Sequence, residues 1–387
     1  MDPAPKRAIG VVTVARSDYG HLVPLLEALR DAPGVTLQLY IAGGHLDPRF
    51  GRTADAIEAD GWSITDRIEM TAISDAAPDV AEAAGRGLAG FARAFARGRP
   101  DVVVLLGDRL EMLTAAVAAL PLTIPVAHLH GGEVTEGAID EQARHAITKL
   151  AHLHFPAAAP YAQRILRMGE EPWRVHCLGA PGLDRLERRA RLSRAELSRR
   201  VGLPLRRPTL LVTFHPVTLE SGETEQQVDE LAAALEAVAG DVVITYPGAD
   251  AGHHAVIRRL EALAASRPGT RVVAALGEDG YCSLLREADV MLGNSSSGLI
   301  EAPSFRLPVV NVGTRQRGRL RAANVIDVGT GRAEILAGIR RALDPAFRES
   351  LAGLVNPLGD GHAAPRIARV LADVELGPRL LRKRFVD

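Results

Sequence analysis

Short hydrophobic runs rich in valine, isoleucine and leucine recur along the first half of the chain, and each is followed by a longer segment with helical periodicity. The runs cover residues 9–14, 37–42, 102–106 and 124–129, and the helical segments include residues 21–29, 79–96 and 141–153. A strand that is hydrophobic throughout is buried on both faces, which is typical of a parallel sheet covered by helices. The pattern therefore predicts an α/β fold.

The same pattern starts again after a charged, arginine-rich stretch at residues 183–208. The later hydrophobic runs cover residues 209–214, 242–246, 271–275, 290–292 and 309–312. A repeated series of strands and helices predicts two α/β domains in tandem. We place the first domain at residues 1–182 and the second at residues 183–364, and we treat residues 365–387 as a C-terminal helical segment.

Composition narrows the class of function. The 387 residues suffice for about two or three domains, and 46 basic against 47 acidic residues give a net charge of −1. Such a balance provides no general attraction to nucleic acid or to a membrane surface, so neither is expected as a partner. The two cysteines match neither a disulfide framework nor a zinc site, and no signal segment or long apolar stretch is visible. We therefore expect a cytoplasmic protein.

Residues that follow the predicted strands are candidates for ligand contact, because ligands bind at the carboxyl ends of the strands in such sheets. Arg16 follows the first strand at the start of a helix, where backbone amides favour a phosphate. Asp108 and Arg109 follow the third strand. Helix capping explains Asp108 equally well from the sequence. Neither the glycine-rich dinucleotide fingerprint nor the P-loop motif is present, so we expect no cofactor.

The stretch after the fourth strand is unusually rich in groups that exchange protons. Residues 128–145 hold three histidines, four carboxylates and three glycines. A lone histidine or glutamate is usually a surface or core residue, but this density after a buried strand is difficult to explain by packing. Carboxylates and imidazoles in a partly dry site can carry out proton transfer at carbon. We therefore predict catalytic roles for His130, Glu133, Asp140 and Glu141.

The second half offers candidates for nucleotide binding. Residues 293–301, with the sequence GNSSSGLIE, follow a strand and are expected to open a helix. Serine hydroxyls, backbone amides and the positive helix end suit a diphosphate, and Glu301 could accept hydrogen bonds from ribose. His215 stands at the end of the strand at 209–214. The histidines lack the common zinc-binding spacings, so no metal is expected.

With these residues, the chain resembles the UDP-N-acetylglucosamine 2-epimerases, in particular the hydrolysing branch of sialic and legionaminic acid synthesis. The resemblance covers nearly the whole chain, through the motifs ARSDYGHL, AGGHLDPRFGRT, LLGDRLE, HLHGGEVTEGAIDEQARHAITKLAHLHF, LGAPGLD, TFHPVT, GNSSSGLIEAP and NVGTRQRGR. It implies a GT-B-like fold of two Rossmann-like domains whose parallel sheets face an interdomain cleft. UDP would bind mainly to the second domain, and the C-terminal helix would return to the first.

The resemblance also implies a mechanism. UDP leaves C1 by elimination as the C2 proton is removed, and water then adds to the glycal with inversion at C2, which releases a free ManNAc-type sugar. Asp108, Asp140, Glu141 and His215 match the catalytic positions of the family. Its substrate contacts are matched by Arg16, Arg109, Ser295, Ser296 and Glu301, and the same motifs contribute His45, Arg144, Asn294 and Arg315.

One position departs from the family pattern. Members of the sialic acid branch commonly carry a catalytic glutamate where this chain has His130. An imidazole differs from a carboxylate in charge and in its available proton. We expect His130 to take part in proton transfer, with Glu133, and we expect the change to accompany a different substrate. The candidates are UDP-GlcNAc and UDP-2,4-diacetamido-2,4,6-trideoxy-glucose (UDP-diacetylbacillosamine).

Three other functions remain open from the sequence. A non-hydrolysing 2-epimerase would keep UDP on the product, and a GT-B glycosyltransferase would transfer the sugar to an acceptor. A protein that only binds sugar nucleotides would use the same residues without chemistry. The acid-rich stretch argues against the glycosyltransferase, since transfer needs at most one base. The family resemblance further implies a homo-oligomer, a dimer or a tetramer.

Overall fold

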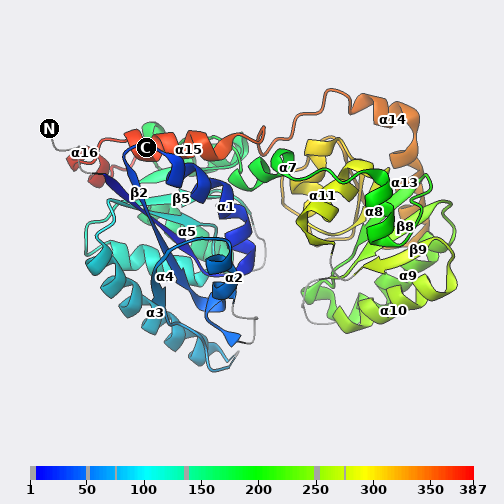
Figure 1. Cartoon of the computed structure of the whole chain (residues 1–387), viewed down its shortest axis with the longest axis horizontal. Helices are drawn as coiled ribbons and strands as arrows, with labels where there is room; N and C mark the ends of the chain where they lie inside the picture. Colours follow the sequence, from blue (N-terminus) through cyan, green and yellow to red (C-terminus); the bar gives the residue numbers. More distant parts are fainter. Residues whose placement is uncertain (1–5, 49–52, 75, 135–138, 248–252, 274–275) are drawn as a thin grey trace. The chain divides into compact units, whose positions relative to one another are not determined.

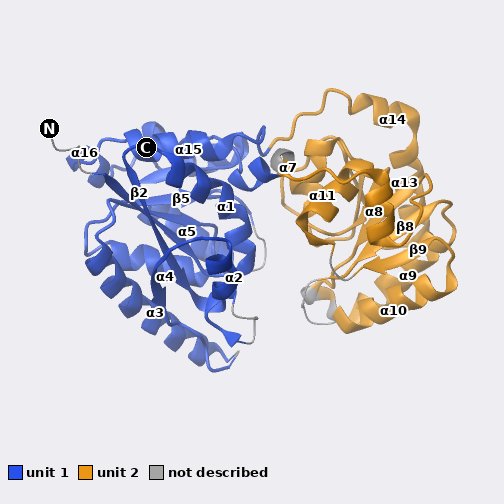
Figure 2. Cartoon of the chain, viewed as in Figure 1, with its two compact units in different colours: residues 1–185, 358–387 blue, residues 186–357 orange. Residues whose placement is uncertain are grey.

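The computed structural model describes residues 6–48, 53–74, 76–134, 139–247, 253–273 and 276–387. The chain forms two compact units, shown in different colours in Figure 2. Unit 1 comprises Met1–Arg185 and Leu358–Asp387, and unit 2 comprises Leu186–Pro357. Among the described residues, no helix is both long enough and apolar enough to cross a membrane.

Unit 1 is built on a parallel sheet of six strands in the order β3-β2-β1-β4-β5-β6. The strands are β1 (Arg7–Thr13), β2 (Val35–Ala42), β3 (Ile64–Ile68), β4 (Val102–Leu106), β5 (Val126–Leu129) and β6 (Leu153–Phe155). The α-helices are α1 (Arg16–Asp31), α2 (Thr53–Ala59), α3 (Ala77–Gly98), α4 (Leu110–Ala119), α5 (Asp140–Leu150), α6 (Ala159–Arg167), α15 (Ala363–Asp373) and α16 (Pro378–Leu381). The 3-10 turns are η1 (Gly43–His45), η3 (Pro172–Arg174) and η4 (Pro181–Leu183). The short helix α7 (Asp184–Arg188) contains the boundary between the units.

Unit 2 has its own six-stranded parallel sheet, in the order β12-β11-β10-β7-β8-β9. Its strands are β7 (Thr209–Thr213), β8 (Asp241–Thr245), β9 (Thr270–Val273), β10 (Val290–Gly293), β11 (Val309–Val312) and β12 (Val325–Val328). Its helices are α8 (Arg194–Val201), α9 (Thr224–Glu236), α10 (His253–Ser266), α11 (Gly277–Glu287), α12 (Ser297–Ile300), α13 (Arg332–Leu343) and α14 (Pro345–Ser350). The turns η5 (Thr218–Glu223) and η6 (Ala302–Phe305) complete the unit.

Helices cover both faces of each sheet, as the hydrophobic runs predict (Figure 1). In unit 1, α1 and α15 pack on one face through Leu22 and Ile367, and α3 and α4 pack on the other through Phe91 and Met112. In unit 2, α9, α10 and α13 cover one face, and α8 and α11 cover the other. Each of the central strands overlaps a hydrophobic run seen in the sequence. For the run at 271–275, residues 274 and 275 lie outside the described residues.

In both sheets the strand order reverses between two neighbouring strands, and ligand sites of such folds lie at that position. In unit 1 the strand order runs outward from β1 on one side and from β4 on the other. In unit 2 the corresponding neighbours are β7 and β10. The carboxyl ends of such strand pairs form a crevice in which ligands bind. The loops after β1, β4, β7 and β10 are therefore the candidate ligand-binding loops.

Asp184 fastens the C-terminal helix α15 to the rest of unit 1. Its buried carboxylate accepts hydrogen bonds from the first backbone amides of α15, Ala363 N at 2.9 Å and Ala364 N at 2.7 Å. These amides have no partner within the helix, and a negative charge at a helix N-terminus is stabilising.

We expect Asp184→Ala to lower the free energy of unfolding by about 2–4 kcal/mol, because two buried amides lose their acceptor. The matched control is Asp360→Ala, which removes an exposed carboxylate ion-paired with Arg366 and should change stability far less. Chemical denaturation of both variants measures the difference. Equal effects would show that Asp184 does not anchor α15.

Candidate active site

In unit 1, the ends of β4 and β5 carry the acidic and imidazole residues predicted from the sequence. Gly107, with φ of 77°, turns the chain out of β4, and Asp108 follows it. His130 comes directly after β5, which ends at Leu129. Because β4 and β5 are neighbours in a parallel sheet, Asp108 and His130 leave the sheet at the same edge.

Arg144 on α5 connects these strand ends. Its side chain is only 2% exposed. The guanidinium donates to the Asp108 carboxylate, to Oε2 of Glu141 at 2.5 Å and to the backbone oxygen of Glu133 at 2.8 Å. A buried guanidinium is stable only when its donors are paired. Arg144, predicted to bind substrate, is therefore interpreted here as the residue that positions the acids.

His130 has an unusual backbone and an unusual charge environment. Its φ of 62° lies in the left-handed region, which is strained for a residue with a Cβ and is often found at functional sites. Nδ1 donates to Oε1 of Glu133 at 2.6 Å. Burial opposes protonation, but the charge and hydrogen bond of Glu133, with a further contribution from Asp108, raise the pKa of His130. Nε2 is buried and has no hydrogen-bond partner in the described part of the chain.

Two residues that sequence reasoning did not select lie beside this cluster. The His21 and His130 ring centroids are 6.5 Å apart, and burial, together with the charge of His130, lowers the pKa of His21 to about 4. Asp18 is 6% exposed, and its Oδ1 lies 3.5 Å from Nε of Arg109. Burial raises the pKa of Asp18 despite the Arg109 charge. Both residues stand in the ARSDYGHL motif, which was the available signal.

The remaining predicted residues of unit 1 occupy different environments. Asp140 begins α5, and its pKa is raised by burial and then by the charge of Asp108. Glu141, beside it, also lies 3.4 Å from Nε2 of His145. Arg16 is exposed at the first turn of α1, and the Arg109 side chain is 45% exposed. Both guanidinium groups are therefore accessible to an anionic ligand.

His45 is fully buried, and both of its ring nitrogens are hydrogen-bonded within unit 1. Nε2 lies 2.9 Å from Oγ1 of Thr13, and Nδ1 lies 2.7 Å from Oγ1 of Thr53. Burial and the charge of Arg109 lower the pKa of His45 to about 4. Its predicted substrate contact has no direct support, and we interpret the ring as holding η1 against β1.

In unit 2, His215 and Asn294 meet where β7 and β10 end. The backbone N of His215 donates to Oδ1 of Asn294 at 2.7 Å, and Nδ2 of Asn294 donates to the His215 backbone oxygen at 2.8 Å. The backbone oxygen of Asn294 accepts from Nε2 of Gln316 at 2.8 Å and from Nη1 of Arg315 at 3.2 Å. The loops after β7, β10 and β11 are thereby joined into one surface.

The serine run opens a helix, as expected. This helix, α12, is a single turn at Ser297–Ile300, and the chain then continues as the 3-10 turn η6. Pro303 has no N–H to donate and excludes a regular helix through this point. Ser297 accepts a hydrogen bond from the Tyr281 hydroxyl at 2.9 Å. Ser295 and Ser296 are partly exposed and remain the candidates for diphosphate contact.

Glu301 follows α12 and is partly buried. Burial raises its pKa, and a hydrogen bond with Ser297 only partly offsets that effect. Its Oε2 atom is buried and has no hydrogen-bond partner in the described residues. A buried carboxyl oxygen without a donor suits a ligand that brings its own hydroxyl groups.

Comparison with known proteins gives a consistent result. A sequence model of the UDP-N-acetylglucosamine 2-epimerase family matches residues 27–372. The chain is 39% identical over 378 residues to the UDP-N,N'-diacetylbacillosamine 2-epimerase (hydrolyzing) of Legionella pneumophila subsp. pneumophila, covering 97% of this chain and 98% of the relative. It is 34% identical over 324 residues to the GDP/UDP-N,N'-diacetylbacillosamine 2-epimerase (hydrolyzing) of Campylobacter jejuni subsp. jejuni, covering 83% and 84%.

Solved structures agree on the fold. The crystal structure of UDP-GlcNAc 2-epimerase from Neisseria meningitidis bound to UDP-GlcNAc matches with a TM-score of 0.74 at 18% identity, and the match covers 94% of this chain and 99% of that one. Together with the two parallel sheets, this likeness confirms the predicted α/β, GT-B-like fold class.

The contact between His130 and Glu133 predicts a measurable titration. We expect the pKa of His130, followed by NMR of the ring, to lie above its ordinary value in the intact protein and to fall in Glu133→Gln. Because the folded-state pKa is raised, the protonated ring stabilises the fold at low pH, and this contribution is lost as the pH rises through that pKa. The exposed control Glu236→Gln should leave the titration unchanged. A pKa that is insensitive to Glu133→Gln would contradict the assigned contact.

Proposed function

The chain belongs to the UDP-N-acetylglucosamine 2-epimerase family, and we propose that it is a hydrolysing 2-epimerase that releases UDP and a free ManNAc-type sugar from a UDP-N-acetylhexosamine. The observation that carries the proposal is the cluster around Arg144, which holds Asp108 and Glu141 beside the His130–Glu133 pair. A site with several proton-exchanging groups suits a reaction that removes one proton from carbon and returns another.

The proposed reaction balances as a hydrolysis. A base removes the C2 proton, the C1–O bond to UDP breaks, and a C1–C2 double bond forms. An acid then delivers a proton to C2 from the opposite face, while the oxygen of water bonds to C1 and its spare proton passes to a base. One water is consumed, and the products are UDP and the sugar inverted at C2.

Unit 1 is proposed to supply the acid and base groups. Asp108, paired with Arg144, serves as the base at C2. His130 serves as the acid, since Glu133 favours its protonated form and Nε2 has its proton available for a substrate atom. Asp140, whose raised pKa favours the carboxylic acid, is the second proton donor. Proton transfer by positioned groups typically contributes about 10²–10⁴-fold to a rate.

Unit 2 is proposed to hold UDP. Ser295 and Ser296 contact the diphosphate, Arg315 and His215 neutralise or orient it, and Glu301 accepts hydrogen bonds from the ribose hydroxyls. The unpartnered Oε2 of Glu301 supports this assignment. In unit 1, the exposed guanidinium groups of Arg16 and Arg109 suit the leaving diphosphate. The proposal requires both sets of residues to act on one substrate molecule.

UDP-2,4-diacetamido-2,4,6-trideoxy-glucose is the proposed preferred substrate. The relative from Legionella pneumophila is named for UDP-N,N'-diacetylbacillosamine, and the relative from Campylobacter jejuni is named for the GDP or UDP form of the same sugar. The product then suits legionaminic acid or another nonulosonic acid as its destination. We propose the cytoplasm as the location, and the free thiols of Cys177 and Cys282 agree with a reducing compartment. We propose a homo-oligomer as the assembly.

The function is tested by proton NMR of the reaction in D2O. With the diacetamido substrate we expect stoichiometric UDP release and a free sugar that is inverted and deuterated at C2. His130→Asn, which removes the titratable ring while asparagine tolerates the left-handed backbone, should lower kcat by about 100-fold or more. His362→Asn, whose exposed side chain precedes α15, is the matched control and should keep full activity.

Three results would contradict the proposal. An epimerised sugar that remains attached to UDP would identify a non-hydrolysing epimerase. An unlabelled sugar bonded to an acceptor would identify a glycosyltransferase. Binding of the nucleotide sugar without turnover would identify a protein that only binds it.

A further inference from the structure

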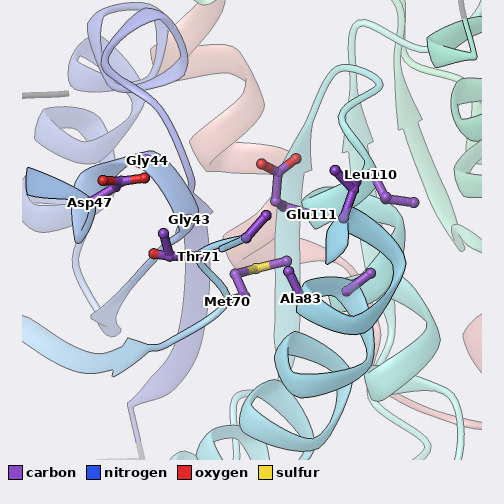
Figure 3. Close-up of a pocket in the computed structure, with 11 residues that line it drawn as sticks. Gly43, Gly44, Asp47, Met70, Thr71, Ala83, Leu110 and Glu111 are labelled. Atoms are coloured by element: carbon purple, nitrogen blue, oxygen red, sulfur yellow. The ribbon is translucent and has the colours of Figure 1, made fainter. Parts of the chain in front are cut away.

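A hollow of about 190 Å³ lies in unit 1, and none of the residues that line it has a role in the proposed mechanism (Figure 3). It is bounded by η1, by the segment after β3, by α3 and by the first turn of α4. Pockets for whole drug-sized ligands measure about 300–1,000 Å³. The space therefore suits one substituent of a ligand rather than a second nucleotide sugar.

The walls of the hollow combine two kinds of chemistry. Asp47 and Glu111 contribute carboxylates, and Figure 3 shows Asp47 at the left and Glu111 near the centre, above the Met70 side chain. The rest of the lining is largely apolar, with Val80, Ala83 and Ala84 from α3. No lysine, arginine or histidine is among the described residues that line the space. The two carboxylates of the described lining repel an anionic group such as phosphate.

A secondary amide fits both kinds of wall. Its N–H can donate to a carboxylate, and its methyl group can pack against Met70 and the alanines of α3. A free ammonium would pair with the carboxylates, but it would be buried against apolar side chains that cannot solvate it. A hydroxyl group would leave the apolar wall without contact.

The position of the hollow relates it to the reaction site. Glu111 stands three residues after Asp108. A Cβ placed on Gly43 would lie 3.4 Å from Oε1 of Glu111 and 3.3 Å from the Val14 backbone oxygen, so these three residues are close neighbours. The hollow is therefore at the carboxyl ends of β1, β2 and β4, on the same sheet edge as Asp108 and His130. β1 and β2 lie on the opposite side of β4 from β5, and neighbouring strands are about 4.8 Å apart.

We propose that this hollow is the subsite for a second acetamido group of the substrate sugar, distinct from the one at the reacting carbon C2. Glu111 accepts the amide N–H, and Met70, Ala83 and Ala84 surround the methyl group. A group on C2 itself must stay close to Asp108 and His130, whereas a group on the far side of the ring reaches past β4 toward β1 and β2. The inference rests on the proposed function and specifies which sugar the site prefers.

The test compares kcat/KM for UDP-2,4-diacetamido-2,4,6-trideoxy-glucose and for UDP-GlcNAc, or an inhibition constant where a compound is not turned over. Ala84 is partly buried on α3, so Ala84→Leu narrows the hollow from its wall. We expect kcat/KM of this variant to fall by about 10-fold or more with the diacetamido substrate and by less than about 3-fold with UDP-GlcNAc. Ala81→Leu, exposed on the same helix, is the matched control and should change neither.

Glu111→Gln is the second variant, because it keeps the volume and removes the charge. It should reduce the preference for the diacetamido substrate by about 3- to 10-fold, whether or not Ala84→Leu folds. Equal losses with both substrates would assign the hollow to the C2 acetamido group and overturn the proposal. Unchanged preference in the folded variants, or better turnover of the 4-amino analogue than of the 4-acetamido compound, would also overturn it.

Failure of the proposed function has a different signature. If the wild-type protein releases no UDP from either compound, the hydrolysing activity is absent and the subsite proposal fails with it. If the wild-type protein hydrolyses both compounds and only the variants fail to discriminate, the function stands and the subsite assignment alone is wrong.

Discussion

The buried ion pair between Arg144 and Asp108 is the interaction on which the candidate active site depends. The Arg144 guanidinium is almost inaccessible to water, so it must find its acceptors inside the protein. Those acceptors come from the end of β4, from the loop after β5 and from α5 itself. Packing α5 onto the sheet therefore fixes the positions of the acids at the same time. The hydrogen bond from Arg144 thereby restricts the Asp108 carboxylate to one position, whereas an unpaired surface aspartate would be mobile.

The two units share the same sheet topology but carry different kinds of side chain at the corresponding strand ends. In each, polar residues follow the two strands at which the sheet changes direction, β1 and β4 in unit 1 and β7 and β10 in unit 2. Unit 1 places charged and titratable groups there, which suit proton transfer. Unit 2 places an asparagine, serine hydroxyls and backbone groups there, cross-linked through Asn294. Such neutral donors suit a diphosphate that must be bound and then released.

Much of the fold could be predicted, because the buried parallel strands are hydrophobic throughout. β3 and β12 were missed, since these edge strands contain polar and charged residues, and β6 was missed because it has only three residues. These errors arise where local composition and tertiary position disagree.

The sequence predicts the residues of the candidate site better than it predicts the contacts between them. Strand-end positions identified Asp108 and His130, but spacing alone does not reveal that Arg144 faces the acids or that His21 approaches His130. The apolar and acidic hollow could not be predicted either, because its walls come from four separate segments between Gly43 and Glu111. Such features depend on side-chain directions that only the folded chain defines.

Steady-state kinetics of Arg144→Lys test the central claim most directly. Lysine keeps the positive charge but cannot donate to three acceptors from one planar group. If Arg144 positions the acids, kcat should fall by about 100-fold, while KM for the UDP-sugar stays within about 3-fold and the exposed control Arg97→Lys is unaffected. An Arg144→Lys enzyme with the wild-type kcat would contradict the account.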